Sequence, residues 1–133
     1  MTLVDTSAWV ALADQGDRLH RPAAEAWGRL RRDREPLLLT DLILAEVAIL
    51  LRHRAGHAAA VQAGEMILAS GVTQVVYADE ALFQAGWALF RRYRDRELSL
   101  TDCVSFALLR RRRLDRVFAF DEDFRIAGFE LLG

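Results

Sequence analysis

Lysine is absent from this sequence of 133 residues, and all 18 of its basic residues are arginine. Codon bias in the genome is the simplest cause, yet the absence has chemical consequences. It excludes Schiff-base catalysis, a phosphate-binding P-loop, and the lysine that response-regulator receivers place beside their aspartates. The formal net charge is only −1 at pH 7, so no global positive field points to nucleic acid.

Cysteine and long apolar runs are also scarce. The single cysteine, Cys103, cannot form an internal disulfide, which fits a reducing cytoplasm. No apolar run approaches the ~20 residues that span a bilayer. The N-terminal segment MTLVDTSAW lacks the basic start and the cleavage site of a signal peptide. We therefore expect a single cytoplasmic domain over residues 1–133, without a membrane segment.

Short apolar segments alternate with helical segments along the whole chain. Strands are predicted at TLVD (2–5), PLLLT (36–40), TQVVYA (73–78) and RVFAF (116–120), with a possible fifth at FELL (129–132). Helices are predicted over 6–14, 20–34, from 41 onward, 57–69, 79–94 and from about 100 onward. This order predicts an α/β fold with a mostly parallel central sheet of four to five short strands.

Two of the predicted strands end in an aspartate: Asp5 follows TLV, and Asp121 follows VFAF. The carboxyl ends of parallel strands share one edge of a sheet, and α/β proteins bind their ligands there. Two more acids can reach that edge. Glu46 lies in the second turn of the helix after the second strand, and Asp102 lies in the first turn of its own helix.

Glu46 is the acid that most needs an explanation. Nine of the ten residues from 42 to 51 are apolar, which predicts a helix buried on all sides. A buried, unpaired carboxylate costs several kcal/mol, so an ion pair with an arginine is one alternative. Asp5, Asp102 and Asp121 have simpler alternatives, as helix caps or as carboxylates that face a helix dipole.

A divalent cation explains all four acids at once. Mg²⁺ and Mn²⁺ prefer carboxylate and water oxygens as ligands. Without a cation, clustered carboxylates repel one another and at least one pKa rises. We therefore expect Mg²⁺ or Mn²⁺ at this edge of the sheet, with Glu46 facing the metal or a water bound to it.

The segments that carry these acids resemble the motifs of PIN-domain ribonucleases, in particular the small VapC-like toxins of type II toxin–antitoxin systems. They are MTLVDTSAWVAL, LTDLILAEVAILL, LSLTDCVSFALL and VFAFDEDF, in that order along the whole chain. The resemblance implies a three-layer α/β/α sandwich, a Mg²⁺- or Mn²⁺-dependent endoribonuclease, a homodimer, and a small antitoxin partner. It also implies four active-site acids, with Asp5 and Asp102 as direct metal ligands and the others acting partly through water: Asp5, Glu46, Asp102 and Asp121.

One position departs from the family pattern. Many members have Thr or Ser before the fourth acid, where this chain has Phe120, so Asp123 is a candidate to share the role of Asp121. The hydroxyls of Thr6 and Ser7 are placed either to donate to Asp5 or simply to cap the helix that follows.

Two other functions remain open from the residues alone. A phosphatase of the haloacid-dehalogenase type also begins with an aspartate after a strand. It needs a second aspartate two residues on, where this chain has Ser7, and a lysine. A catalytically inactive domain that keeps only the fold for protein interactions is the second alternative, and the full set of acids argues against it.

An RNA substrate requires cationic partners, because phosphate contacts dominate affinity. The arginine clusters RRYRDR (91–96) and RRRRLDR (110–116) are candidates, although arginine also suits a helix C-terminus. His53 and His57 are spaced as metal ligands can be, but Gly56 between them argues against ligation. The three tryptophans, Trp9, Trp27 and Trp87, are expected in the core rather than as platforms for base stacking.

Overall fold

The central sheet of the computed structural model, which describes all residues 1–133, has five parallel strands in the order β3-β2-β1-β4-β5. The strands are β1 (Thr2–Val4), β2 (Leu37–Thr40), β3 (Thr73–Val76), β4 (Arg116–Phe118) and β5 (Glu130–Leu132). The predicted parallel sheet is confirmed, and its fifth strand is present. β1 and β2 are buried throughout, as expected for central strands covered on both faces.

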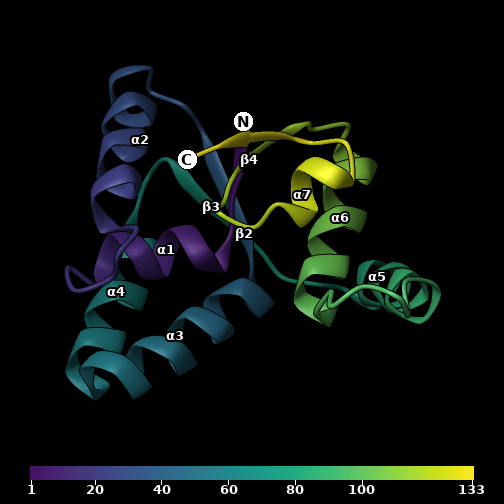
Figure 1. Cartoon of the computed structure of the whole chain (residues 1–133), viewed down its shortest axis with the longest axis horizontal. Helices are drawn as coiled ribbons and strands as arrows, with labels where there is room; N and C mark the ends of the chain where they lie inside the picture. The colour runs from purple at the N-terminus through teal and green to yellow at the C-terminus, as the bar shows by residue number, and fades with distance from the viewer.

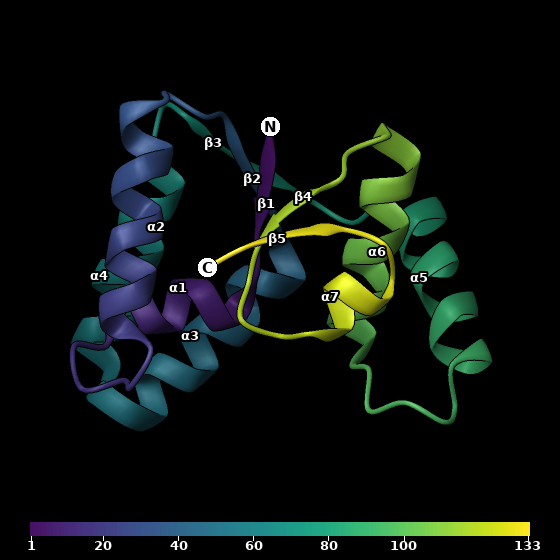
Figure 2. The ribbon, with the colours of Figure 1, turned by 45° about the horizontal axis from the view of Figure 1, so that its top comes forward.

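Seven helices form two layers around the sheet, so the predicted three-layer sandwich is confirmed. Figures 1 and 2 show α1 to α4 on one side and α5 to α7 on the other. The helices are α1 (Thr6–Ala13), α2 (His20–Arg32), α3 (Asp41–Ala55), α4 (His57–Ala69), α5 (Glu80–Arg92), α6 (Leu100–Arg112) and α7 (Asp123–Ile126). None of them combines the length and the apolar character needed to cross a membrane.

Polar side chains begin four of these helices. The N-cap residues Asp5, Thr40, Asp79 and Ser99 each accept a hydrogen bond from a backbone N–H in the first turn. Such a cap satisfies one of the donors that a helix start leaves unpaired. Two of the caps, Asp5 and Thr40, directly follow strands β1 and β2, so they start helices at the carboxyl edge of the sheet.

The prediction that α3 is buried on all sides is wrong. Ile43, Val47 and Leu51 face the core at a spacing of four residues. The opposite face is open to solvent, and Ile49 is 66% exposed. Helix α3 packs mainly against α4 and α1, and Ala45, Ala48 and Ile49 on its other side are exposed. Glu46 is accordingly half-buried rather than enclosed.

Helices α5 and α6 pack unusually closely at Gly86. A Cβ atom at this position would lie 2.8 Å from the Val104 Cα and 2.9 Å from its backbone nitrogen. Only glycine fits such an approach, and it places Leu82 and Gly86 of α5 against α6. This packing fixes α6, which carries Asp102.

Replacing Gly86 with alanine should therefore destabilise the fold by roughly 1–3 kcal/mol, the usual cost of overpacking. Gly64 in α4 provides the matched control, because nothing lies within 4 Å of its Cβ position. Gly64→Ala should stabilise by about 0.5–1 kcal/mol through helix propensity. Urea unfolding of both variants measures the difference, and equal midpoints would contradict the close α5–α6 packing.

Candidate active site

The four predicted acids line one cavity of about 400 Å³. They come from four different parts of the chain: the end of β1, the second turn of α3, the first turn of α6, and the segment after β4. The acids are Asp5, Glu46, Asp102 and Asp121. The structure thus brings together residues that are up to 116 positions apart, counting from 5 to 121 in the sequence.

Asp5 is the most enclosed of the four and is only 4% exposed. Its backbone N–H donates to the carbonyl of Phe118 (2.9 Å), which fixes the end of β1 against β4. Its Oδ2 accepts from the Ser7 hydroxyl at 3.0 Å and from the Ser7 backbone N–H at 3.4 Å. Its Oδ1 is buried and has no hydrogen-bond partner. A buried carboxylate oxygen without a donor is costly, so this atom is the clearest sign of a missing cationic partner.

The hydroxyls of Thr6 and Ser7 have different tasks. Ser7 donates to Asp5, as predicted, and its oxygen accepts from the backbone N–H of Phe120 (3.1 Å). The Thr6 hydroxyl donates instead to Glu46 Oε1 (3.2 Å), so of these two hydroxyls only that of Ser7 bonds to Asp5. Ser7 therefore connects the end of β1 to the segment after β4, where this chain has Phe120 in place of Thr or Ser.

Asp102 and Asp121 each accept a hydrogen bond from a backbone N–H near a helix start, and both line the cavity. Asp102 forms a capping box with Ser99: its Oδ2 accepts from the Ser99 N–H (3.1 Å), and its own N–H donates to the Ser99 hydroxyl (3.0 Å). Asp121 Oδ1 accepts from the N–H of Asp123 (2.9 Å) at the start of α7. The first-turn position expected of Asp102 is thus confirmed, whereas the N-cap of α7 is Glu122 and not Asp121; neither finding excludes a shared site.

Burial and mutual repulsion perturb the acids of this cavity. Burial, together with the charge of Asp102, raises the pKa of Asp5 to about 7. Burial raises the pKa of Asp102 to about 6, helped by the charges of Asp121 and Glu46 and opposed by its hydrogen bonds with Ser99. Perturbed acids in a cavity are typical of functional sites.

The donor set fits a hard cation with few protein ligands. No group of three or more Asp, Glu, His or Cys side chains is arranged to hold a metal ion by itself. Mg²⁺ is commonly held by one or two carboxylates and completes its shell with water and substrate oxygens. Asp5 has an unpaired buried Oδ1, and burial raises the pKa of Asp102, so a positive partner would favour the charged form of both carboxylates.

The alternative explanation of Glu46 as half of an ion pair is wrong, since no arginine is paired with it. Asp123 does not line the cavity, although burial and the charge of Asp121 raise its pKa. The segment 110–113 begins near the end of α6, about 12 Å along the helix from Asp102. Sequence reasoning missed two arginines that do line the cavity, Arg18 and Arg54.

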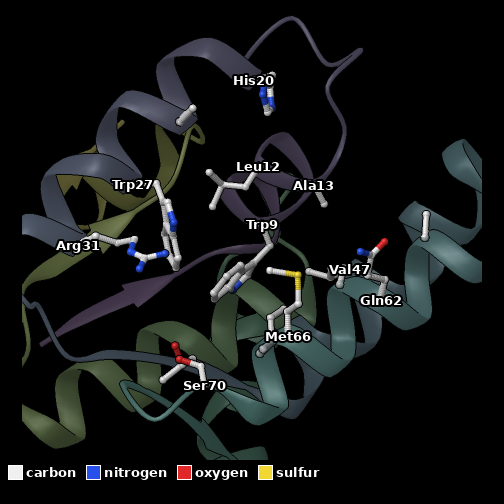
Figure 3. Close-up of a pocket in the computed structure, with 15 residues that line it drawn as sticks. Trp9, Leu12, Ala13, His20, Trp27, Arg31, Val47, Gln62, Met66 and Ser70 are labelled. Atoms are coloured by element: carbon white, nitrogen blue, oxygen red, sulfur yellow. The ribbon is translucent and has the colours of Figure 1, made fainter.

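A second, apolar cavity of about 610 Å³ lies between α1, α2 and α4, and we call it the apolar groove. Trp9 and Trp27 line it with ring centroids 5.7 Å apart, and Met66 lies beside Trp9 in Figure 3. Trp9 is buried and Trp27 packs against the core, as expected. Trp87 is 41% exposed on α5, so its expected place in the core is wrong.

A model of the PIN domain family matches residues 2–130, and the chain belongs to this family. The fold and the acidic cavity therefore define a PIN domain. One relative is the 23S rRNA-specific endonuclease VapC20 of Mycobacterium tuberculosis, recorded in strains CDC 1551 / Oshkosh and ATCC 25618 / H37Rv. It is 38% identical over 130 residues, which cover 97% of this chain and 95% of the relative.

Solved structures support the same assignment. The crystal structure of Mycobacterium tuberculosis VapC20, a sarcin–ricin loop cleaving toxin, matches with a TM-score of 0.87 and 36% identity. The match covers 98% of this chain and 97% of that chain. A chain from a toxin–antitoxin complex of Klebsiella pneumoniae matches with a TM-score of 0.66 and 17% identity, over 100% of this chain and 97% of that chain. This second likeness shows the shared fold alone.

Proposed function

We propose that this protein is a metal-dependent endoribonuclease that acts in the cytoplasm as the toxin of a toxin–antitoxin pair. The observation that carries the proposal is the convergence of four carboxylates, from distant parts of a PIN domain, on one cavity. The identity of 38% with a 23S rRNA-specific endonuclease supports RNA as the substrate, and ribosomal RNA as its class.

Asp5 and Asp102 are the residues that would hold Mg²⁺ or Mn²⁺. The bound ion would polarise the scissile phosphate and lower the pKa of a coordinated water. Ser7 holds the Asp5 carboxylate in place through its hydroxyl, and Ser99 holds that of Asp102 through the capping box. Both carboxylates are thus oriented before substrate arrives, which limits reorganisation during the reaction.

Glu46 and Asp121 have the roles of orienting the attacking water and accepting its proton. Glu46 is held by the Thr6 hydroxyl at Oε1, and Asp121 by the N–H of Asp123 at Oδ1. In each case the other carboxylate oxygen has no protein donor and is available to a water molecule. A positioned base of this kind contributes typically 10²–10⁴-fold to a rate.

The other two functions are disfavoured. The PIN match over residues 2–130 argues against a phosphatase of the haloacid-dehalogenase type, in agreement with Ser7 and the missing lysine. An inactive interaction domain would have no need for a buried, unpaired oxygen on Asp5 beside Asp102.

The activity is tested with an RNA hairpin that carries the sarcin–ricin loop of 23S rRNA. Purified protein should cut it in the presence of Mg²⁺ or Mn²⁺, and EDTA should stop the reaction. Full activity in EDTA would contradict the metal dependence. Failure to cut this hairpin or total cellular RNA under any metal condition would contradict the ribonuclease assignment.

The partner that we propose is an antitoxin with an amphipathic segment that occupies the apolar groove. Met66 is 68% exposed at the groove, and Trp9 Nε1 is buried there without a hydrogen-bond partner. Trp9 and Val10 lie on the helix between the groove and the acidic cavity, so one peptide can reach both. We propose that the peptide inserts an Arg or Lys among the acids, since guanidinium binds carboxylates with paired hydrogen bonds.

We also propose that the protein is a homodimer and that α5 contributes to the contact. Phe83, Trp87 and Phe90 form an exposed stripe on α5, each between 37% and 41% exposed. The rings of Trp87 and Phe90 lie 5.6 Å apart. Aromatic side chains of this kind are enriched at protein interfaces, and the same stripe on a second copy gives a self-complementary contact.

Two charge-introducing variants separate these surfaces. Trp87→Glu should convert the dimer to a monomer, seen by light scattering after size-exclusion chromatography, and leave antitoxin binding intact. Met66→Glu should weaken antitoxin binding by at least about tenfold, as a buried charge at a hot spot does, and leave the dimer intact. Each variant is the control for the other, and the opposite pattern would reverse the two assignments.

A further inference from the structure

The acidic cavity has a cationic wall that the four carboxylates do not explain. Arg18, in the loop between α1 and α2, and Arg54, in the last turn of α3, both line it. Neither arginine is paired with any of the four acids. Asp17, the ion-pair partner of Arg54, also lines the cavity, so one region carries four carboxylates and the other carries two arginines with one aspartate.

The arrangement along α3 defines where the positive charge lies. Glu46, Leu50 and Arg54 all line the cavity, and their spacing of four residues places them on one face of the helix. Eight residues separate Glu46 from Arg54, which corresponds to about 12 Å along the axis. Arg54 thus lies about two helical turns beyond Glu46, which places it for a backbone phosphate beside the scissile one rather than for the scissile phosphate itself.

Arg54 is held in position before any ligand arrives. Its Nη1 donates to Asp17 Oδ2 at 2.9 Å, and Asp14 Oδ2 lies 4.0 Å away. The loop that carries these aspartates is itself fixed, because Asp17 Oδ1 accepts from the Leu19 N–H (2.8 Å) and Asp14 Oδ1 from the Gly16 N–H (3.0 Å). The Arg54 side chain is still 46% exposed, and only one of its nitrogens makes a bond to an acid, so donors remain for a ligand.

Arg18 complements Arg54 as a free cation. It is exposed, and no ion pair in the structure includes it. An RNA strand that approaches four carboxylates is repelled, and cations elsewhere in the cavity offset that repulsion. Arginine suits this task because its planar group forms paired hydrogen bonds with phosphate oxygens.

We propose that Arg18 and Arg54 are the RNA-positioning residues of the acidic cavity, and that they bind backbone phosphates beside the scissile one. The inference rests on the proposed ribonuclease function. The RNA contacts are therefore assigned to Arg18 in the loop and Arg54 on α3. They are not assigned to the arginine clusters at 91–96 and 110–116. Phosphate contacts position a strand without reading its sequence, so any specificity for a particular RNA comes from elsewhere.

The test measures RNA binding apart from cleavage, in an Asp5→Asn parent that should not cut. The probes are the sarcin–ricin hairpin and a scrambled hairpin of equal length, both followed by fluorescence anisotropy over a range of salt concentrations. Arg18→Ala and Arg54→Ala should each weaken binding of both RNAs by roughly tenfold, as the loss of one charge-assisted contact does. Each should also reduce the slope of log K against log salt by about 0.7–1.

Matched controls remove the same charge nearby. Arg52 is exposed on α3 two residues before Arg54, and Arg21 is exposed on α2 three residues after Arg18; neither lines the cavity. Arg52→Ala and Arg21→Ala should leave affinity and slope close to those of the parent. If Arg18→Ala and Arg54→Ala match these controls while the parent binds RNA, the inference is wrong and the ribonuclease assignment stands. A parent that binds no RNA overturns both.

A purely structural role of Arg54 is tested through its partner. If Arg54 only tethers the loop between α1 and α2, Asp17→Asn should weaken RNA binding as much as Arg54→Ala, because it breaks the same ion pair. If Arg54 binds phosphate, Asp17→Asn keeps the arginine and removes the anion that competes for it, which should offset the loss of the positioning contact and leave binding equal or tighter. The first explanation thus predicts weaker RNA binding by Asp17→Asn, and the second predicts no loss of binding.

Discussion

Asp5→Asn and Asp102→Asn are each expected to reduce RNA cleavage to the background of the assay while the protein stays folded. Each change removes a charged oxygen from the pair that would hold the metal, and asparagine is a poor substitute for a carboxylate ligand of Mg²⁺. Glu46→Gln and Asp121→Asn should lose a smaller factor, on the order of 10²–10⁴, because they remove a base rather than a ligand. Single-turnover cleavage of the hairpin at saturating Mn²⁺ measures all four.

Asp79→Asn is the matched control for these variants. Like Asp5, Asp79 is the N-cap of a helix, and its Oδ1 accepts from the Leu82 N–H (2.7 Å). Asparagine caps about as well as aspartate, so both exchanges preserve the cap. Only Asp5→Asn should lose activity, because Asp79 does not line the cavity. Undiminished cleavage by folded Asp5→Asn protein would contradict the proposal that this cavity is the nuclease active site.

The sequence was sufficient for the parts of the fold that depend on local signals. The strand β1 and the cap Asp5 follow each other directly, as do β2 and the cap Thr40, so their order predicts both the element and the edge where the acid lies. The placement of Asp102 was weaker from the pattern alone, because its helix follows no strand directly, and the family resemblance supported it. The position of Asp102 in the cavity depends on the packing of α5 against α6 at Gly86. No pattern in the sequence predicts this close packing.

The sequence was insufficient where the outcome depends on which neighbours a helix lacks. An apolar run such as residues 42–51 gives no sign that one face of α3 stays open and that Ile49 is exposed. The same reason applies to Trp87, whose hydrophobicity favours burial although α5 presents it to solvent. These apolar surfaces are better explained by partners outside the chain than by the packing within it.

The cationic wall was missed for a different reason. Neither Arg18 nor Arg54 belongs to an arginine cluster, and the clusters dominate any search by local charge density. The ion pair between Arg54 and Asp17 spans 37 residues and forms only when the loop between α1 and α2 folds back on α3. Contacts of this kind depend on the tertiary fold, so the single arginines that matter most for the cavity were not distinguishable from the others.

In metal-free protein, Asp5→Asn should be more stable than the native chain at neutral and alkaline pH. The pKa of Asp5 rises from 3.8 to about 7 in the folded state, because of burial and the charge of Asp102. The folded state therefore holds this proton more tightly than the unfolded state. Stability from the protonated form is fully present below pH 3.8 and is lost as pH rises through about 7. The loss amounts to up to about 4 kcal/mol, and Asn, which never ionises, avoids it.

Urea unfolding in EDTA between pH 5 and pH 8 measures this effect. The stability advantage of Asp5→Asn should widen across the range, and a smaller decline should remain in the variant because burial also raises the pKa of Asp102 to about 6. Asp33→Asn changes an exposed carboxylate outside the cavity, so its stability should change with pH in the same way as that of the native protein. Adding Mn²⁺ should restore the stability of the native protein at pH 8 and leave Asp5→Asn nearly unchanged, since the ion binds the folded state through Asp5. The contrary result would be a native protein that becomes more stable than Asp5→Asn as the pH rises from 5 to 8 in EDTA. It would show that the charged Asp5 carboxylate is stable in the folded protein without a metal. Asp5 would then no longer support a cation site.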